Sequence, residues 1–309
     1  MTFSIVARSA DGRALGVAVA SKFLGVGAAV PAALADVGAV ATQSYANLAY
    51  RPQALALLGT GVAATETVAA LLAGDAGPVD HRQVGVVGPT GDGATFTGTA
   101  CHDWAGGTAG DGYAIQGNML AGPQVVEKME AAWLAGTSID RLAHRLLAAL
   151  RAGDDAGGDR RGRQSAALLV VAKGMGYGGT SDVLVDLRVD DHAAPVTELG
   201  RLLEMHTLYF ERPDPATLLE LTGPLADEVR DRLSAAGHSG DLDEALASWA
   251  GIENLEERIV PAAIDPLVLA HLRAAQPESA TVAAPGSPLP PGSVPADKPS
   301  AARAPRPPA

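Results

Sequence analysis

The sequence lacks features that mark several classes of protein. It has one cysteine, Cys101, so no internal disulfide is available. Its longest apolar runs, around residues 26–35 and 166–172, are far shorter than the ~20 residues that a membrane helix needs. The first eight residues lack the basic and apolar regions of a secretory signal. We therefore expect no membrane segment and a cytoplasmic protein.

Basic charge and aromatic residues are also scarce. The 309 residues include 23 Lys and Arg against 35 Asp and Glu, which gives a formal net charge of −12. Nucleic acids and anionic membranes bind clustered Lys and Arg, so neither is expected as a partner. Aromatic residues make up 4% of the chain, hydrophobic residues 47%, and 36 residues are glycine. A closely packed core of Val, Leu, Ile and Ala is therefore expected.

Periodicity and composition divide the chain into three parts. Residues 1–212 alternate β-rich runs with helical patterns, which predicts an α+β domain of sheets covered by helices. Residues 213–275 carry only helical patterns and predict a small all-α module. Residues 276–309 hold ten of the 21 prolines, so we expect a disordered Pro-rich tail.

The expected elements of the first part begin with a hairpin around Asp11 and Gly12. Ser138 is expected to cap the second of the two central helices. The predicted strands are 3–9, 14–20, 37–43, 83–88, 94–97, 113–118, 165–172 and 183–189. The predicted helices are 51–58, 63–73, 124–135, 139–152 and 196–210, followed in the module by 223–236, 242–250 and 266–274.

Thr2 is the first candidate for chemistry, because it follows Met1 and opens the first strand. Removal of Met1 would leave a free hydroxyl beside an α-amine with a pKa of about 7.7–8.0, which suits a general base. The hairpin returns Ser21 and Lys22 to Thr2, where a lysine would stabilise negative charge. A second-position threonine is also common as an ordinary strand residue, and that alternative stays open.

Polar side chains also end two other strands. Gln43, Ser44 and Asn47 follow the third strand, and Gly117 and Asn118 close the strand 113–118. The glycine permits close backbone approach, and the Asn118 amide would serve as an oxyanion donor. The same residue types are typical of turns.

A glycine-rich loop before the strand 165–172 contains Asp159, Arg160, Arg161 and Arg163. Guanidinium groups bind carboxylates or phosphates bidentately, although the spacing is not that of a P-loop, and a solvated basic loop is the alternative. The acidic cluster at residues 186–192 fits no metal-binding pattern, so no metal or cofactor is expected.

Several of these motifs, in this order, resemble the family DUF1028. They are Met1–Arg8, Gly16–Phe23, Ala39–Ser44, Gln116–Leu120, Gly157–Leu168 and Asp186–His192. The resemblance covers about residues 1–212 and implies a four-layer αββα sandwich similar to the N-terminal nucleophile (Ntn) hydrolases. It further implies that Thr2, freed of Met1, is the nucleophile. The proteasome-like Asp near Ser21 and the Lys at the start of the third strand are absent here.

The module at 213–275 resembles a peptidoglycan-binding domain, through Gly223–Leu225, Trp249 and Glu253–Glu256 among others. This likeness implies a peptidoglycan fragment as a partner. It conflicts with the absence of a recognisable secretory signal.

Two functions follow from these observations. The first is an amidohydrolase that cleaves a C–N bond in a small-molecule or peptide-like amide. Thr2 would attack, Lys22 would tune charge, Gly117 and Asn118 would hold the oxyanion, and Arg160 or Arg163 would bind an acidic group. The second is a non-catalytic scaffold that docks through its module and tail. By analogy with other two-sheet sandwiches, a homo-oligomer is expected.

Overall fold

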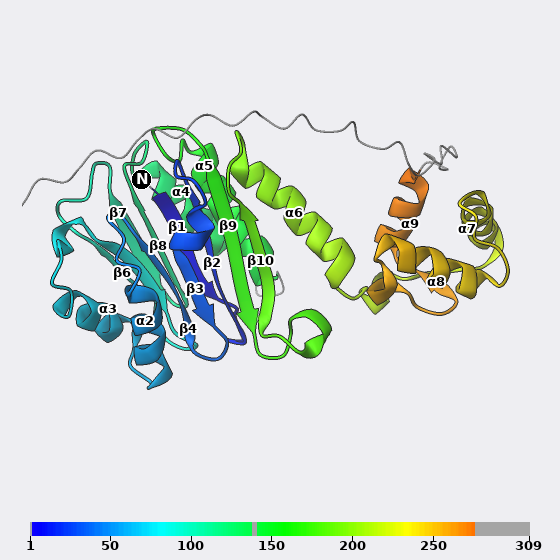
Figure 1. Cartoon of the computed structure of the whole chain (residues 1–309), viewed down its shortest axis with the longest axis horizontal. Coiled ribbons are helices and arrows are strands. Elements are labelled where there is room, and N and C mark those ends of the chain that lie inside the picture. Colours follow the sequence, from blue (N-terminus) through cyan, green and yellow to red (C-terminus); the bar gives the residue numbers. More distant parts are fainter. Residues whose placement is uncertain (1, 138–140, 276–309) are drawn as a thin grey trace, which may run out of the picture.

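The computed structural model describes residues 2–137 and 141–275 (Figure 1). The predicted cap at Ser138 and the predicted tail lie outside these residues. Two antiparallel sheets form the first part of the chain. The larger sheet has the order β10 (Val183–Val189), β9 (Ser165–Ala172), β2 (Ala14–Ser21), β1 (Thr2–Arg8), β8 (Tyr113–Asn118), β7 (Gly106–Gly110). The smaller has the order β3 (Pro31–Leu34), β4 (Gly38–Gln43), β5 (Gln83–Val87), β6 (Ala94–Thr97).

Helices cover the outer face of each sheet. The larger sheet carries α4 (Gln124–Ala135), α5 (Leu142–Asp155) and α6 (Pro195–Phe210), and the smaller carries α2 (Tyr50–Gly59) and α3 (Ala64–Ala73). The short α1 (Val26–Ala29) lies beside β9 and β2. The layers therefore run helix, sheet, sheet, helix (Figure 1), which confirms the predicted α+β class.

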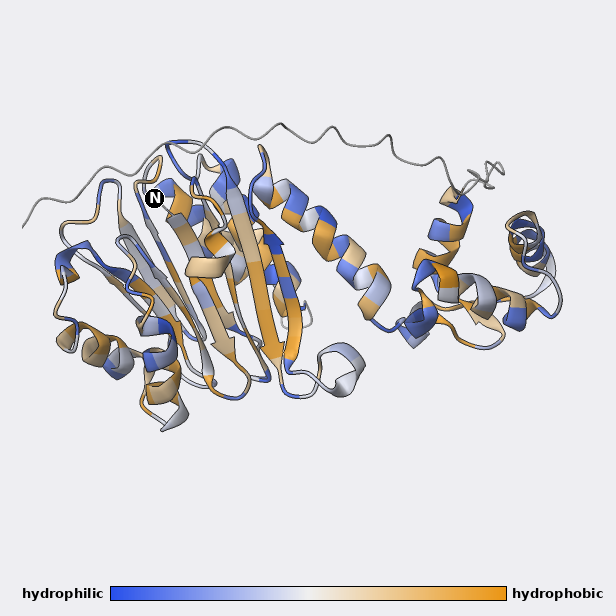
Figure 2. Ribbon diagram, in the orientation of Figure 1, coloured by the Kyte–Doolittle hydropathy of each residue, from blue (hydrophilic) through white to orange (hydrophobic). Residues whose placement is uncertain are grey.

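Side chains alternate between the two faces of the larger sheet, so this sheet contributes to two hydrophobic cores, one on each face. In β1, Phe3, Ile5 and Ala7 pack under the helices, whereas Val6 faces the second sheet. This follows from the two-residue period of a strand, which sends successive side chains to opposite faces. Figure 2 shows the central strands strongly hydrophobic, while α6 alternates hydrophobic and hydrophilic residues along its length. Such a helix buries one stripe and leaves the other to solvent.

Most predicted elements are present within a few residues of their expected ends. The structure also contains β3, β7, α1 and two short strands, Leu219–Glu220 and Ala263–Ile264, none of which was predicted. β7 reads Gly-Gly-Thr-Ala-Gly and β3 reads Pro-Ala-Ala-Leu, so neither shows a run of alternating large apolar and polar side chains. Both are edge strands, so each is held in its sheet by backbone hydrogen bonds to a single neighbouring strand.

The C-terminal part is almost wholly helical, as predicted. It contains α7 (Gly223–Ala235), α8 (Leu242–Glu253) and α9 (Pro266–Ala274), with one strand pair, β11 (Leu219–Glu220) and β12 (Ala263–Ile264). Single 3₁₀ turns occur at Val79–His81, Tyr177–Gly179, Pro215–Thr217 and Glu256–Arg258. No helix in residues 2–137 or 141–275 is both long and apolar enough to span a bilayer.

A buried ion pair joins the C-terminal helices to α6. Arg258 and Asp265 have side chains only 3% and 4% exposed, and they bond directly. Arg258 Nε also donates to the Leu208 carbonyl at 2.8 Å, and Nη2 donates to the Thr207 carbonyl at 2.5 Å. The guanidinium thus satisfies the free carbonyls at the end of α6, whose Leu208 and Tyr209 pack against the core of the C-terminal helices.

Replacing Arg258 by Met should destabilise the C-terminal helices by about 3–5 kcal/mol, because Asp265 would stay buried without its partner. Denaturant unfolding followed by Trp fluorescence measures the loss, since Trp249 lies in that core. Arg230→Met is the matched control, because Arg230 pairs with Asp227 at the surface and should cost under about 1 kcal/mol. Equal losses in the two variants would contradict the interpretation.

Candidate active site

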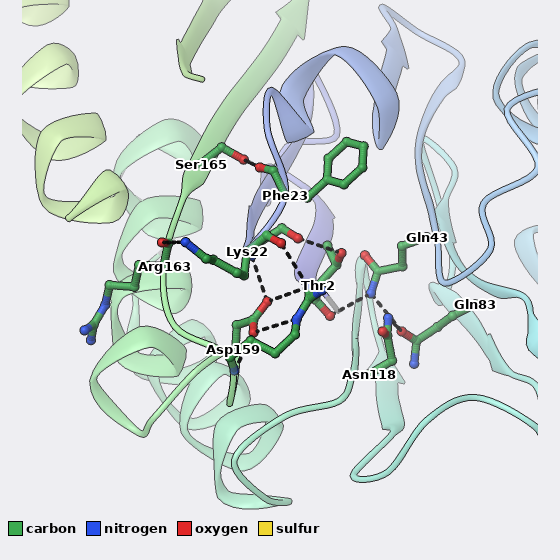
Figure 3. A network of polar contacts seen from close by, with 11 residues as sticks. Thr2, Lys22, Phe23, Gln43, Gln83, Asn118, Asp159, Arg163 and Ser165 are labelled. Atoms are coloured by element: carbon green, nitrogen blue, oxygen red, sulfur yellow. Dashed lines mark hydrogen bonds and ion pairs between the residues drawn. The ribbon is translucent and has the colours of Figure 1, made fainter. Parts of the chain in front are cut away.

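Thr2 is the first residue of β1, and the neighbouring strands β2 and β8 both end beside it. It is directly opposite Asn118 of β8, and its Oγ1 is 3.1 Å from Oγ of Ser21, the last residue of β2. Its side chain points between the sheets, on the same face as Ser4 and Val6. Thr2 is only 7% exposed, so its hydroxyl is held in a largely enclosed polar environment (Figure 3).

The space between the sheets changes character along β1. Around Val6 it is filled by apolar side chains such as Val17 and Ala114. Toward Thr2 it is filled by buried amides and a hydroxyl that bond to one another, namely Ser4, Gln43, Gln83, Gln116 and Asn118. Ser4 Oγ donates to Gln43 Oε1 at 2.7 Å and accepts from Gln116 Nε2 at 2.7 Å. We call these five residues the amide network.

Gln83 sets the orientation of its neighbours in the amide network. Its Nε2 donates to the Gly117 carbonyl at 2.7 Å and to Thr97 Oγ1 at 2.8 Å. A carbonyl can only accept, so Gln83 must turn its NH2 there and its Oε1 the other way. That Oε1 accepts from Gln43 Nε2 at 2.8 Å and from Asn118 Nδ2 at 2.9 Å. Both amides are therefore held with their NH2 groups toward Gln83.

Gln43 connects the amide network to Thr2, the candidate nucleophile. Its Nε2 also donates to the Thr2 carbonyl at 3.2 Å (Figure 3), so an amide of the second sheet fixes the backbone at the start of β1. Asn118 sits beside Thr2 on the same face of the sheet, at the close spacing of directly paired residues. An amide N–H and a hydroxyl are thus neighbours at this end of the sheet.

The structure gathers some of the predicted residues and separates others. Thr2, Ser21, Gln43, Gly117 and Asn118 meet at one end of the sandwich. Gly117 lies in β8, which pairs with β1 on one side and with β7 on the other. Its backbone N–H is therefore part of a strand inside the sheet.

Other predicted residues have structural partners instead. The Asn47 side chain accepts from the Ala49 N–H at 3.1 Å, just before α2, and Ser44 Oγ contacts Cys101 Sγ at 3.4 Å. The guanidinium of Arg163 pairs with Asp154 at 2.8 Å and points away from Thr2 (Figure 3).

Asp159 acts as a clamp rather than an open ligand. It is 7% exposed, and its Oδ2 accepts from the Lys22 N–H at 2.7 Å. Its two oxygens also accept from the Arg161 backbone and guanidinium at 2.9–3.4 Å. The ammonium of Lys22 extends to the Arg163 carbonyl, 3.3 Å away, rather than to the Thr2 hydroxyl (Figure 3).

Sequence analysis missed Ser4, Gln83 and Gln116. A signal for two of them was present, because Thr2 and Ser4, like Gln116 and Asn118, are polar residues two apart in strands that are otherwise apolar. Polar residues on one face of a buried strand indicate a buried network. Among the described residues, no group of three or more His, Cys, Asp or Glu is placed to hold a metal ion.

The amide network depends on a missing side chain at Gly85. A Cβ built on Gly85 would lie 2.1 Å from Gln116 Oε1, so Gly85→Ala should force Gln116 out of place and lower the free energy of unfolding by about 1–3 kcal/mol. Thermal unfolding measures it. The control is Gly59→Ala at the end of α2, whose Cβ would meet only Val37 at 3.8 Å. A Gly85→Ala protein as stable as the Gly59→Ala protein would argue against this packing.

Comparisons with known proteins place the chain. The family model described as "Family of unknown function (DUF1028)" matches residues 2–199, and one described as "Putative peptidoglycan binding domain" matches residues 209–272. A crystal structure of a Silicibacter pomeroyi protein with the DUF1028 family model is 29% identical, with a TM-score of 0.59; the match covers 74% of this chain and 92% of the other. No curated protein matches. Since the first model spans well over half of the sequence, the chain belongs to the DUF1028 family.

Proposed function

We propose that this protein is an amidohydrolase of the N-terminal nucleophile type, with Thr2 as the nucleophile after removal of Met1. The observation that carries the proposal is the hydroxyl of the first strand residue, 3.1 Å from Ser21 and beside the Asn118 amide. The layer order of helix, sheet, sheet, helix, which the Ntn hydrolases share, supports it.

The α-amine is the base in this mechanism. While Met1 is attached, the Thr2 nitrogen belongs to a peptide bond and has no basic lone pair. Once freed, the amine takes the proton from Oγ1 as that oxygen attacks the carbonyl carbon of the substrate amide. The proton then passes to the leaving nitrogen as the C–N bond breaks, which leaves an acyl ester on Thr2. Water hydrolyses the ester, releasing a carboxylic acid and restoring the hydroxyl.

In the proposed reaction, Asn118 stabilises the oxyanion and Ser21 positions the Thr2 hydroxyl. Gln83 takes one N–H of the Asn118 amide, and the second N–H is the proposed donor to the oxyanion of the tetrahedral intermediate. Because Gln83 fixes the amide before substrate arrives, no reorganisation is needed when the charge develops. Ser21 Oγ holds the Thr2 hydroxyl in place, and the Lys22 ammonium adds positive potential at this end of the sheet.

Labelling with an alkyl β-lactone tests Thr2. Its Oγ1 would open the lactone ring and add the whole mass of the probe to the N-terminal peptide. Mass spectrometry should show Met1 absent and the adduct on Thr2, and Thr2→Val should lower the labelling rate by about 10³-fold or more. Valine keeps the shape of the side chain, so unchanged thermal unfolding of that variant shows that the fold is intact.

Thr2→Ser keeps both hydroxyl and amine and should retain labelling. Retained Met1 on labelled protein would exclude the amine as base. Absence of labelling in all three proteins would favour a non-catalytic scaffold.

A second activity, binding to peptidoglycan, is favoured by the family model that matches residues 209–272. We expect the full chain to sediment with purified murein sacculi and to be released by soluble muropeptides. Chitin is the matched control polymer, because it has related sugars but no peptides. Equal sedimentation with chitin, or none with sacculi, would contradict the proposal.

A further inference from the structure

The loop of residues 157–163, which contains three arginines, is attached at the end of the sheet where Thr2 lies. It is tied to the segment after β2, where the Lys22 N–H donates to Asp159 and Arg161 Nη2 donates to the Lys22 carbonyl at 3.0 Å. It is also tied to the segment after β8, where the Arg160 N–H donates to the Met119 carbonyl at 3.3 Å. Because β2 and β8 flank β1, both attachments hold the loop at the Thr2 end of the sheet.

The acidic groups at this end neutralise only some of its cations. Arg163 pairs with Asp154, and Arg161 pairs with Asp159, whose two oxygens are fully used. Arg160 is exposed, and in the described parts of the chain its guanidinium has no ion pair or hydrogen bond. The Lys22 ammonium meets a carbonyl but no carboxylate there. Arg160 and Lys22 therefore carry positive charge without a carboxylate partner in the described parts of the chain, on segments attached at the Thr2 end of the sheet.

This arrangement is not explained by a shortage of acidic residues. The chain has 12 more acidic than basic side chains, and some exposed arginines elsewhere have carboxylate partners, as Arg188 has in Asp186 and Arg201 in Glu198. Arg160 and Lys22 stay unpaired where the loop is otherwise closely bonded. Unpaired cations in a fixed loop beside a nucleophile are suited to bind an anion of the substrate.

Apolar side chains stand next to these cations. Phe23 and Leu24 are 55% and 63% exposed, although their backbone is well fixed. Ser165 Oγ donates to the Phe23 carbonyl and accepts from the Val26 N–H at 3.1 Å. In Figure 3 the Phe23 ring points away from Thr2, and the Lys22 side chain extends toward Arg163. The segment that follows Ser21 therefore carries a positive charge and two exposed apolar side chains.

We propose that the substrate is an N-acylated amino acid or a closely similar amide, with a free carboxylate near the scissile bond. Arg160 and Lys22 bind the carboxylate, and Phe23 and Leu24 contact the apolar acyl chain. The inference rests on the proposed role of Thr2. It assigns Arg160, rather than the paired Arg163, to the acidic group.

A pair of β-lactone probes tests the substrate class, one with a free carboxylate next to the ring and the other its methyl ester. Protein shown by mass spectrometry to lack Met1 should be labelled on Thr2 about tenfold or more faster by the acid, as expected for a charge-assisted hydrogen bond. Arg160→Gln and Lys22→Gln should each bring the ratio of the two rates toward one. Arg160→Glu should invert it. Arg201→Gln on α6 is the control, and its ratio should match the wild type.

The outcomes separate the two proposals. Labelling by both probes at equal rates would overturn the substrate class and leave Thr2 as nucleophile. A preference for the acid that survives in Arg160→Gln and Lys22→Gln would also overturn it. Labelling by neither probe would overturn the nucleophile itself, and this inference with it.

Discussion

The hydrogen bonds of Gln83 are the interaction on which the Thr2 end of the sandwich depends. Its side chain is fully buried between two sheets, where an unpaired amide would cost about 1–3 kcal/mol. Both ends of the amide are bonded, to Gly117 and Thr97 on one side and to Gln43 and Asn118 on the other. A polar layer is therefore tolerated in a core that is otherwise made mostly of valine and alanine, and it joins the sheets where their apolar contacts end.

That polar layer also links packing to chemistry. The Gly117 carbonyl cannot donate, so it determines how Gln83 is turned, and Gln83 in turn determines how Gln43 and Asn118 are turned. The carbonyls of Gly117 and Gly106 thus orient, through Gln83, the group that holds the Thr2 carbonyl and the group proposed to bind the oxyanion. A water-filled gap would not transmit this order, because water both donates and accepts. The candidate site is organised by the core itself.

The limits of sequence reasoning at this site have physical causes. The strand containing Thr2 and its hairpin with the strand of Ser21 follow from alternation and turn residues, which are local, whereas Gln43 and Asn118 come together only through Gln83 of the second sheet. Which of three neighbouring arginines is free depends on where Asp154 and Asp159 lie after folding. Gln83 opens a predicted strand, but its role needs the second sheet opposite it. Likewise, β7 is held by pairing with β8 rather than by its own side chains.

The shared helix α6 constrains what the C-terminal helices can do. Its first turns pack under the larger sheet through Val196, Leu199 and Leu203, and its last turn enters the second core. Arg258 then fixes that last turn from the other side. A helix that belongs to two cores is a stiff connector, unlike a flexible linker. Figure 1 places these helices beyond α6, away from the N-terminal end. The shared helix and the buried ion pair thus couple the packing of the C-terminal helices to that of the larger sheet.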